Sequence, residues 1–464
     1  MRTAIVIGAC ALVSAIAHAD PDPANPPEPA AEARPAPAPE AQPAPAPAPE
    51  PPRPIVGFAV RGDSKVQPRT VGYLAHIAVG DLVGPADIPA IQQALLSSEL
   101  FTTVSVALEP APGDPSPGAV VAITADDKHS WIIAPTAFAL PGNLAFGIGF
   151  AENDFRGLDQ KILLYGQIGT YTSLLFGTFL DPAYHGTKLT WRTDLYCFRR
   201  NIDEYQNPRS DPTSFAIDRT TTATYLGGGA LIGWNFLWWL AADLRLRGAY
   251  VYFRDAKDSA GQAIASPEKD DWDFSLQMHV TVDHRYHRYG VTWGTYAQLN
   301  LEPSIPGVGY DYQLAMLRAY HSWRLFDEHE LELRGHFNVG RHLPLHEDLS
   351  LGGVSDLRGY DVDQFRGDVR AVARAEYSIP LFKWRFLAFR ALGFYDTGYV
   401  GFHFPRARDY LPDQLGRGYV RNDVGAGLRI YLNNIVLPLL GFDLGYGIEG
   451  HSPEIYFEVG LTDF

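Results

Sequence analysis

The chain has 464 residues, a formal net charge of -15 at pH 7 and 46% hydrophobic residues. The acidic balance argues against a nucleic-acid partner, because a protein that binds phosphates needs a basic patch. The length permits more than one domain, so a shift of composition along the chain is the first boundary to look for.

Residues 1–19 have the layout of a cleaved secretory signal, with one arginine, an apolar run and a small-residue end at 17–19. We therefore expect the mature chain to begin near Asp20. The alternative, lipid attachment at Cys10, would leave an apolar stretch of only about seven residues. Once the signal is removed, Cys197 is the sole cysteine, so no intramolecular disulfide can form.

Residues 20–54 consist mainly of Pro, Ala and Glu and contain almost nothing to bury. Such a segment cannot form a core and tends to an extended polyproline II conformation, at about 3.1 Å per residue. We interpret it as a solvated, disordered linker. A specific ligand for another domain is the alternative.

Residues 55–128 are predicted to form one small α+β domain. The expected elements are a strand at 55–60, a helix at 68–77, a helix at 87–101, and strands at 104–109 and 119–124. In the second helix, the apolar residues 88, 91, 95 and 96 recur at helical spacing and predict one buried face. We expect Gly80 to end the first helix and residues 81–85 to form a turn.

This β-α-α-β-β order, with Leu100 and Phe101 at the entry to the second strand, resembles a polypeptide-transport-associated (POTRA) domain. An unpaired sheet edge in such a domain can add a strand from an extended polypeptide of any sequence. The resemblance therefore implies a domain that captures client polypeptides.

From residue 129 to residue 464 the hydrophobic period is two. For example, Phe274, Leu276 and Met278 alternate with Ser275 and Gln277. No run of about eighteen apolar residues follows the signal, so we expect no helical membrane span. The pattern predicts a closed antiparallel transmembrane β-barrel, with an apolar face toward lipid and a charged face toward a wet lumen. The segment has room for about sixteen strands with their connections.

Aromatic residues gather near the ends of several predicted strands: Trp234, Trp238, Trp239, Tyr250 and Tyr252. Their positions are typical of the interfacial girdle of a membrane barrel. Ordinary strand packing explains them equally well, so both interpretations stay open.

One connection, at about 343–368, is much longer than a barrel turn needs and is rich in Gly and Asp. A connection of that length is usually either functional or disordered. The residues in and after it favour a functional loop.

The sequence LGGVSDLRGY, followed by AEYSIPLF and GFYDTGYV, resembles the last third of the BamA/TamA/two-partner-secretion superfamily of outer-membrane insertases and translocators. The resemblance implies that the long connection folds back into the lumen as a lid. It also implies a lid tip formed by Arg358, Gly359 and Tyr360, which bonds to carboxylates on neighbouring strands. Carried onto this chain, those carboxylates are Glu376 and Asp396.

The strand pattern agrees with this assignment. Glu376 shares one face of a predicted strand with Arg374, while the other face is apolar, so Glu376 should point into the lumen. Asp396 likewise shares a face with Arg390. The arginine of the tip suits the role because its planar fork can bond two oxygens and stays charged at any working pH. Gly359 would let the tip turn sharply beside the wall.

Both ends of the predicted barrel carry further resemblance. The stretch FGIGFAENDFRGLDQ looks like the family's early strand and turn, with Asn153, Phe155 and Gly157 in place. The chain ends on the aromatic Phe464, as substrates of the barrel-assembly machinery do. However, the apolar residues at 455–461 alternate one residue out of phase with Phe464, so this C-terminal barrel signal is shifted or bulged.

Enzyme motifs are not apparent in the sequence. It contains no GxSxG elbow and no P-loop. The stretch DHRYHRY at 283–289 has metal-ligand residue types but neither thiolate nor HExxH spacing, and we interpret it as a solvated charged turn. We expect no enzymatic activity, no cofactor and no metal site.

The sequence thus predicts a protein of the Gram-negative outer membrane that inserts or translocates client polypeptides, with its α+β domain and linker in the periplasm. Its expected partners are those clients, outer-membrane lipid, and periplasmic chaperones or accessory subunits. Two alternatives belong to other classes. One is a passive pore or structural barrel with the same architecture, and the other is a soluble periplasmic binding module.

Overall fold

The computed structural model of the chain describes residues 51–98, 100–111, 118–140, 143–206, 216–288, 291–326, 328–385, 387–404, 418–432 and 438–459. The predicted signal, nearly all of the predicted linker and Phe464 lie outside these ranges. Predictions about them therefore stay predictions.

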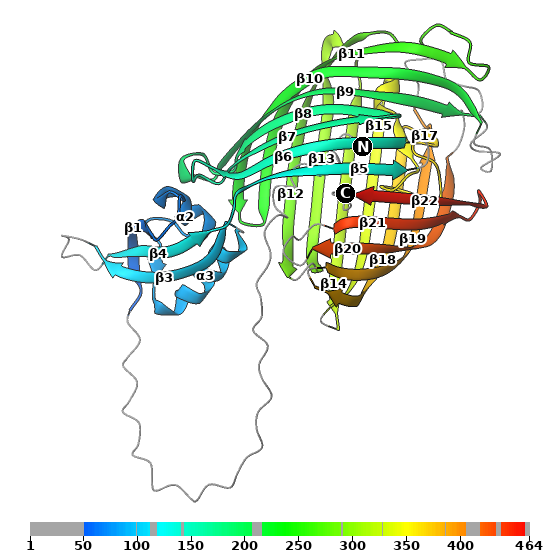
Figure 1. Ribbon diagram of the computed structural model, residues 1–464. Coiled ribbons are helices and arrows are strands. Elements are labelled where there is room, and N and C mark those ends of the chain that lie inside the picture. The colour runs from blue at the N-terminus through cyan, green and yellow to red at the C-terminus, as the bar shows by residue number, and fades with distance from the viewer. Residues whose placement is uncertain are drawn as a thin grey trace, which may run out of the picture.

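The first described segment forms an α+β unit with a four-stranded sheet of order β2-β1-β4-β3 (Figure 1). Its elements are β1 (Arg53–Arg61), α2 (Pro68–Leu74), β2 (Leu82–Val83), the 3₁₀ turn η1 (Pro85–Asp87), α3 (Ile88–Ser97), β3 (Phe101–Pro110) and β4 (Ala119–Asp127). β1 pairs with β4 in parallel and β3 with β4 antiparallel. Ile91 and Leu95 of α3 are buried in its core, as the helical spacing predicts.

The first helix of this unit is shorter than predicted. It ends at Leu74, before His76 adopts a left-handed backbone with φ of 58°, so Gly80 does not end it. Instead, the amide of Gly80 donates a hydrogen bond to the carbonyl of Ile55, at 2.8 Å. The end of α2 is closed locally, because the amides of His76 and Ile77 donate to the carbonyls of Tyr73 and Gly72, at 3.2 and 2.9 Å. The predicted turn at 81–85 contains the short strand β2.

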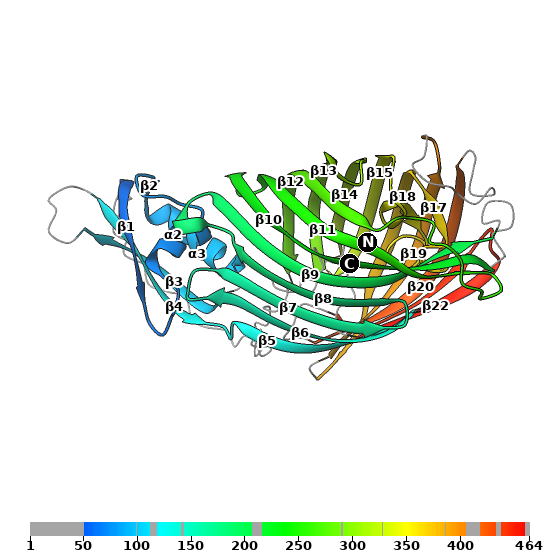
Figure 2. The ribbon, with the colours of Figure 1, turned by 90° about the horizontal axis from the view of Figure 1, so that it is seen from above.

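Sixteen strands of the described residues form a closed barrel in which every neighbouring pair is antiparallel, so the predicted fold class is confirmed (Figures 1 and 2). The first eight strands are β5 (Trp131–Leu140), β6 (Asn143–Phe155), β7 (Gln160–Gly169), β8 (Thr172–Asp181), β9 (Leu189–Tyr205), β10 (Ile217–Leu237), β11 (Leu240–Asp258) and β12 (Asp271–Arg288). The other eight are β13 (Val291–Gly309), β14 (Gln313–Leu325), β15 (His329–Arg341), β18 (Val369–Trp384), β19 (Leu387–Gly401), β20 (Tyr419–Leu432), β21 (Pro438–Gly447) and β22 (Ser452–Val459).

The barrel has an apolar outer face and a charged interior. On β15, Leu333 and Phe337 are 44% and 48% exposed on the outside, while the intervening Arg334 pairs with Glu332 on the opposite face. Similarly, Leu246 of β11 is exposed outside, and its neighbours in the sequence are buried arginines. This inside-out distribution is what a lipid-facing wall around a polar lumen requires.

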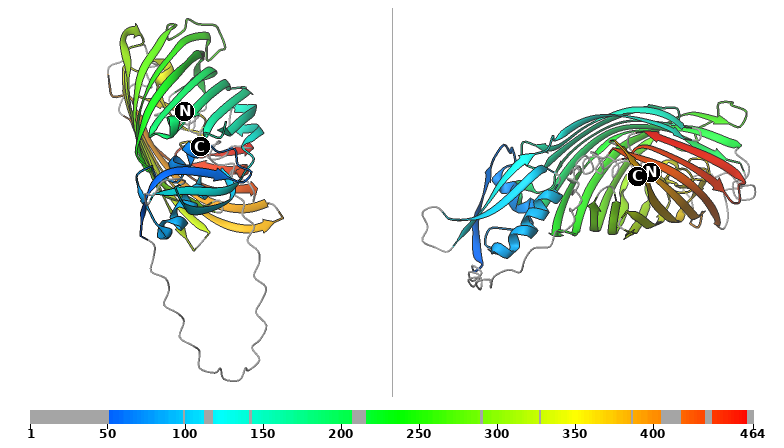
Figure 3. Two further views of the ribbon diagram at one scale, coloured as in Figure 1. Left: turned by 90° about the vertical axis from the view of Figure 1, so that its left-hand side faces the viewer. Right: turned by 60° about the horizontal axis from the view of Figure 1, so that its bottom comes forward.

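The two ends of the barrel differ. The α+β unit lies beyond one end, hereafter the near end, next to the turn between β6 and β7 (Figures 2 and 3). The opposite end, hereafter the far end, carries the long connection between β15 and β18. Strand lengths also differ around the wall: β9 to β13 have 17 to 21 residues, whereas β5, β21 and β22 have 8 to 10.

Candidate functional site

The connection between β15 and β18, residues 342–368 and hereafter the lid, folds back into the barrel. It contains the 3₁₀ turn η3 (Leu345–Glu347) and a two-stranded sheet of β16 (Leu349–Leu351) and β17 (Phe365–Gly367). Almost all lid residues beyond His342 are buried. The lid shares an apolar cluster with β18 and β19, made up of Leu351, Leu357, Tyr360, Phe365, Val372 and Val400.

Arg358 lies at the tip of the lid, among carboxylates of the barrel wall. Its Nε and Nη2 donate hydrogen bonds to the two oxygens of Asp396, at 2.8 and 3.0 Å, and its Nη1 donates to Glu376, at 2.8 Å. Asp443 lies 3.6 Å from Nη1, and the ring centroid of Phe394 lies 3.4 Å from the guanidinium carbon. The structure therefore brings together Arg358, Glu376 and Asp396, and adds Asp443 and Phe394, which the motif did not indicate.

These contacts join several strands of the wall. Glu376 is on β18, Asp396 on β19 and Asp443 on β21, so a single guanidinium holds carboxylates of three strands. The side chain of Arg358 is 1% exposed, and charge-assisted bonds in such a place are stronger than neutral ones. The lid tip therefore fixes the relative position of the strands on this side of the barrel.

Gly359 is required at the tip because of a close approach. A Cβ on this residue would lie 2.3 Å from the backbone nitrogen of Gly447, and the amide of Gly359 donates to Asp423, at 3.1 Å. Its φ is outside the left-handed region. The predicted sharp turn is present, since the amide of Tyr360 donates to the carbonyl of Leu357, at 3.3 Å. Glycine is needed there because of the contact with β21 and β20 and not because of a left-handed backbone.

Tyr360 completes the tip and is fully buried. Its hydroxyl donates a hydrogen bond to Glu449, at 2.5 Å, and lies 3.2 Å from the carbonyl oxygen of Asn422. Its own carbonyl accepts a bond from the hydroxyl of Tyr456 on β22, at 2.7 Å. The tip therefore also contacts the last described strand of the barrel.

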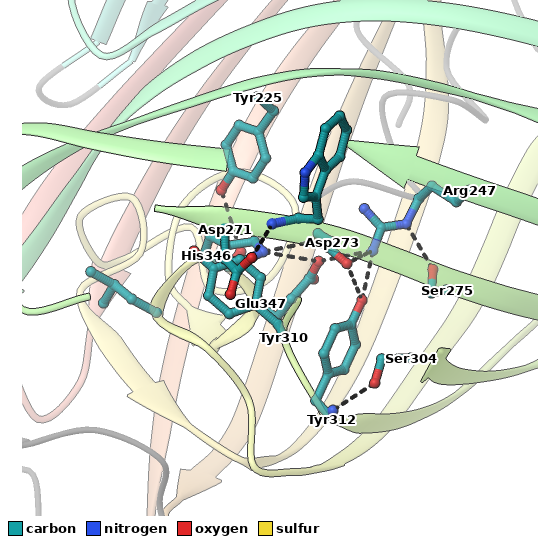
Figure 4. Close-up of polar contacts among 12 residues, drawn as sticks. Tyr225, Arg247, Asp271, Asp273, Ser275, Ser304, Tyr310, Tyr312, His346 and Glu347 are labelled. Atoms are coloured by element: carbon teal, nitrogen blue, oxygen red, sulfur yellow. Dashed lines mark hydrogen bonds and ion pairs between the residues drawn. The ribbon is translucent and has the colours of Figure 1, made fainter. Parts of the chain in front are cut away.

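The lid has a second anchor, which the sequence motifs did not indicate, on the wall formed by β10 to β13 (Figure 4). His346 is 2% exposed, and its Nε2 lies 3.0 Å from Asp273 on β12. Arg247 of β11 contacts Asp273, at 2.6 Å, and Glu347 of the lid, at 3.5 Å. Asp273, His346 and Glu347 offer ligand atoms within 4.8 Å of one another, but the guanidinium of Arg247 already supplies a cation there.

The early barrel turn forms one contact with the α+β unit, and Gly186, between β8 and β9, lies against Arg69 in another. The carbonyl of Gly157 accepts hydrogen bonds from the amide of Gln67, at 2.8 Å, and from the hydroxyl of Thr70, at 3.2 Å. A Cβ on Gly157, whose φ is +71°, would lie 1.8 Å from the carbonyl oxygen of Lys65. The backbone amide of Asn153 donates a hydrogen bond to the carbonyl of Ser130, at 2.8 Å.

Phe155, the third predicted residue of this region, lies at the end of β6. The guanidinium carbon of Arg156 lies 4.9 Å from its ring centroid. Asp159 in the same turn is 6% exposed, and its amide donates to Asp154, at 2.8 Å. Burial, aided by the negative charges of Asp154 and Asp181 and opposed by Lys161, raises the pKa of Asp159 to about 6.

The barrel closes between β22 and β5, hereafter the seam. Only three residue pairs of the described strands face each other there, from Phe457 with Ala139 to Val459 with Ala137. β21 and β22 share eight such pairs, and β5 and β6 share ten. Within the described part of the chain, the seam therefore has the fewest facing pairs of any two neighbouring strands in the barrel.

No helix within the described residues is both long and apolar enough to cross a membrane. The sequence profile of the Omp85 superfamily domain matches residues 154–462. This range includes the lid, the strands that hold its tip, and most of the barrel.

Three solved structures are similar to the chain over most of its length. BamA from Haemophilus ducreyi lacking POTRA domains 1–3 has a TM-score of 0.59 at 13% identity, covering 87% of this chain and 84% of that one. CdiB from Acinetobacter baumannii has 0.60 at 12% identity, with 88% and 74% covered. CdiB from Escherichia coli has 0.55 at 12% identity, with 90% and 92% covered. At these identities the structures show a shared fold.

Proposed function

Because this chain belongs to the Omp85 superfamily and has an outer-membrane β-barrel of that type, we propose that it inserts or translocates client polypeptides at the outer membrane of a Gram-negative bacterium. One observation carries the proposal. The Arg358 tip is buried against carboxylates of β18 and β19 inside the lumen. Because the lid occupies the lumen, little room is left for solutes to diffuse freely through the barrel.

The α+β unit is proposed to capture clients as a POTRA domain in the periplasm. β3 lies at one edge of its sheet, and among the described residues it pairs only with β4. At the other edge, β2 has only two residues and pairs with Arg53 and Pro54 of β1. The ten-residue β3 therefore offers a row of backbone donors and acceptors to which an extended client of any sequence can add.

The seam supports one route for the client. Docking of the α+β unit at the turn between β6 and β7 places it near the first strands of the barrel, one of which, β5, forms the seam. A client strand released from β3 could pair with the free edge of β5 or β22 once the three facing pairs separate. The lumen is the competing route and would require the lid to move.

Depletion of the protein tests this function. The outer-membrane and secreted proteins of depleted cells are inventoried by quantitative proteomics, and re-expression of the full chain is the control. We expect a defined set of clients to disappear from the membrane or medium and to return on re-expression. An unchanged inventory would contradict the proposal.

A passive pore is the competing function, and conductance in planar bilayers separates the two. A lumen occupied by the lid should give small, flickering currents, whereas a porin should give large, steady ones. Large steady currents from the full chain would therefore favour the passive pore.

A further inference from the structure

The middle of the lid is held on the barrel wall by one arginine. Arg370 of β18 donates hydrogen bonds to the carboxylate of Asp356, at 2.8 Å, and to the carbonyl of Ser350, at 2.7 Å. Both partners belong to the lid, and within the described residues Asp356 is the one carboxylate that pairs with Arg370. The lumen therefore already contains an acidic polypeptide segment bound to a guanidinium of the wall.

Two further basic side chains continue this surface across β15 and β14. Arg318 of β14 faces His336 of β15. Their neighbours Leu317 and Phe337 are exposed outside, so Arg318 and His336 point into the lumen. Arg370 lies on the lumenal face of β18, one diagonal step from His336, and long side chains can reach one another over that distance. We call Arg318, His336 and Arg370 the basic strip.

The part of the basic strip beyond the lid has no acidic partner. In the part of the chain that the structure describes, neither Arg318 nor His336 makes an ion pair or a side-chain hydrogen bond. The titratable groups that act electrostatically on Arg318 are Arg370 and the phenol of Tyr296. Both side chains are only half-buried, so a ligand in the lumen can reach them. By contrast, the cavity beside the lid tip is lined by as many carboxylates as arginines.

We propose that the basic strip binds acidic segments of client polypeptides inside the barrel, and that Asp356 of the lid occupies one end of it until a client carboxylate takes its place. The planar fork of Arg318 can bond both oxygens of a carboxylate, and even a neutral His336 can donate one N–H beside it. The lid and the client then compete for Arg370. This inference rests on the proposed function and deepens it by naming the chemistry of the client segment.

Binding of a fluorescent peptide of alternating Glu and Ser to the purified full chain in detergent tests the proposal, with anisotropy as the measurement. The chain has a net charge of -15, so most of it repels this peptide, and binding reports a local basic site. We expect saturable binding at about 50 mM salt that weakens as the salt concentration rises. The matching peptide of Gln and Ser should not bind.

Variants of the strip and of the lid should change the affinity in opposite directions. Arg318→Gln should weaken binding of the Glu peptide roughly fivefold, the upper range for a partly solvated ion pair, whereas Arg318→Lys should retain most of it. Asp356→Asn should strengthen binding, because Arg370 is then available to the peptide. A variant that merely damages the barrel would not gain affinity. Heat-modifiable migration on a gel verifies that each variant is folded.

Arg245→Gln is the matched control. It removes the same charge from the lumenal face of β11, but Arg245 is paired with Asp194, which keeps Arg192 as a second partner, at 3.6 Å. This variant should bind the Glu peptide as the unmodified chain does. Absence of binding, an equal loss in Arg245→Gln, or displacement of the peptide by an equal concentration of inorganic phosphate would overturn the proposal. The measurement contains no natural client, so it can fail while the depletion experiment succeeds, and the reverse.

Discussion

At the scale of single residues, the lid tip shows how a barrel interior can hold charge. Asp396 is 0% exposed and accepts bonds from both Arg358 and Arg374. Glu376 has 29% of its side chain exposed, so lumen solvent shares in its stabilisation. The effect of losing Arg358 should therefore come mainly from Asp396 and less from Glu376.

Arg358→Ala should accordingly destabilise the barrel and lower client assembly. Leaving a buried carboxylate without one of its cations costs roughly 3 to 5 kcal/mol, and we expect the lower end because Arg374 remains. The urea midpoint of the heat-modifiable band measures the first effect, and the yield of client in the membrane measures the second. Arg334→Ala is the control, since the side chain of Arg334 is 30% exposed, against 1% for Arg358, so lumen solvent should make its loss smaller. Equal losses in both variants would contradict the role assigned to Arg358.

Asp159 predicts a pH dependence at the near end. Burial raises its pKa from 3.8 to about 6, so between these values the folded chain binds a proton that the unfolded chain does not. Stability should therefore fall as the pH rises through this window, by no more than about 3 kcal/mol. Asp159→Asn should remove this dependence, because Asn tolerates the left-handed φ of 55° found there.

Urea midpoints at about pH 4.5 and about pH 7.5 for the unmodified chain and Asp159→Asn provide the measurement. The difference between the two proteins isolates the contribution of this carboxyl from all others that titrate. Parallel shifts in both proteins would show that Asp159 is not the group responsible.

At the scale of elements, the turn between β6 and β7 contacts the α+β unit, which the sequence pattern predicts as a domain separate from the barrel. Gly157 has no room for a side chain because the backbone of Lys65 passes against it. The α+β unit and the first barrel hairpin are therefore held together by backbone contacts that only glycine permits. The unit should follow the barrel as one body while this contact lasts.

Gly157→Ala should undock the unit. The added Cβ would overlap the carbonyl of Lys65 and break the bond between Gln67 and Gly157, so we expect protease cleavage between the unit and the barrel to rise at least about tenfold, equivalent to roughly 1.4 kcal/mol. Gly261→Ala is the control, since Gly261 also has a left-handed φ, of +75°, but nothing lies within 4 Å of its Cβ position. Equal sensitivity in the two variants would point to backbone strain alone.

The strands could be predicted from the sequence because each has one face toward the outside and one toward the lumen. Apolar and polar residues therefore alternate with a period of two, as Leu333 and Arg334 do. The Arg358 tip could be predicted because its motif is local. The end of α2 could not, because a histidine, His76, and not a glycine holds the left-handed position there. The anchor at His346 could not, since its partner is far away in the chain. Asp273 is 73 residues from His346, and in LPLHEDL the histidine looks like any polar loop residue.

At the scale of the whole molecule, the barrel wall is uneven. β9 to β13 are long and share extended ladders, with 17 facing pairs between β9 and β10. The seam has three. Because each backbone hydrogen bond contributes about 1 kcal/mol net, the barrel should open first between β22 and β5. The lid tip, which contacts β22 through Tyr456, lies close enough to couple to that opening.

A disulfide across the seam therefore decides between the two routes proposed for the client. In a Cys197→Ser background, cysteines replace Ala139 and Phe457, which face each other across the seam. The control pair replaces Leu317 and Phe337, which face each other between β14 and β15 and are both exposed outside. If clients pass through the seam, the first lock should lower client assembly at least about tenfold and a reductant should restore it, because a covalent bond prevents the three pairs from separating. The control lock should have no effect. Full activity of the protein with the locked seam would instead indicate that the client passes through the lumen. The lid would then have to move out of the lumen.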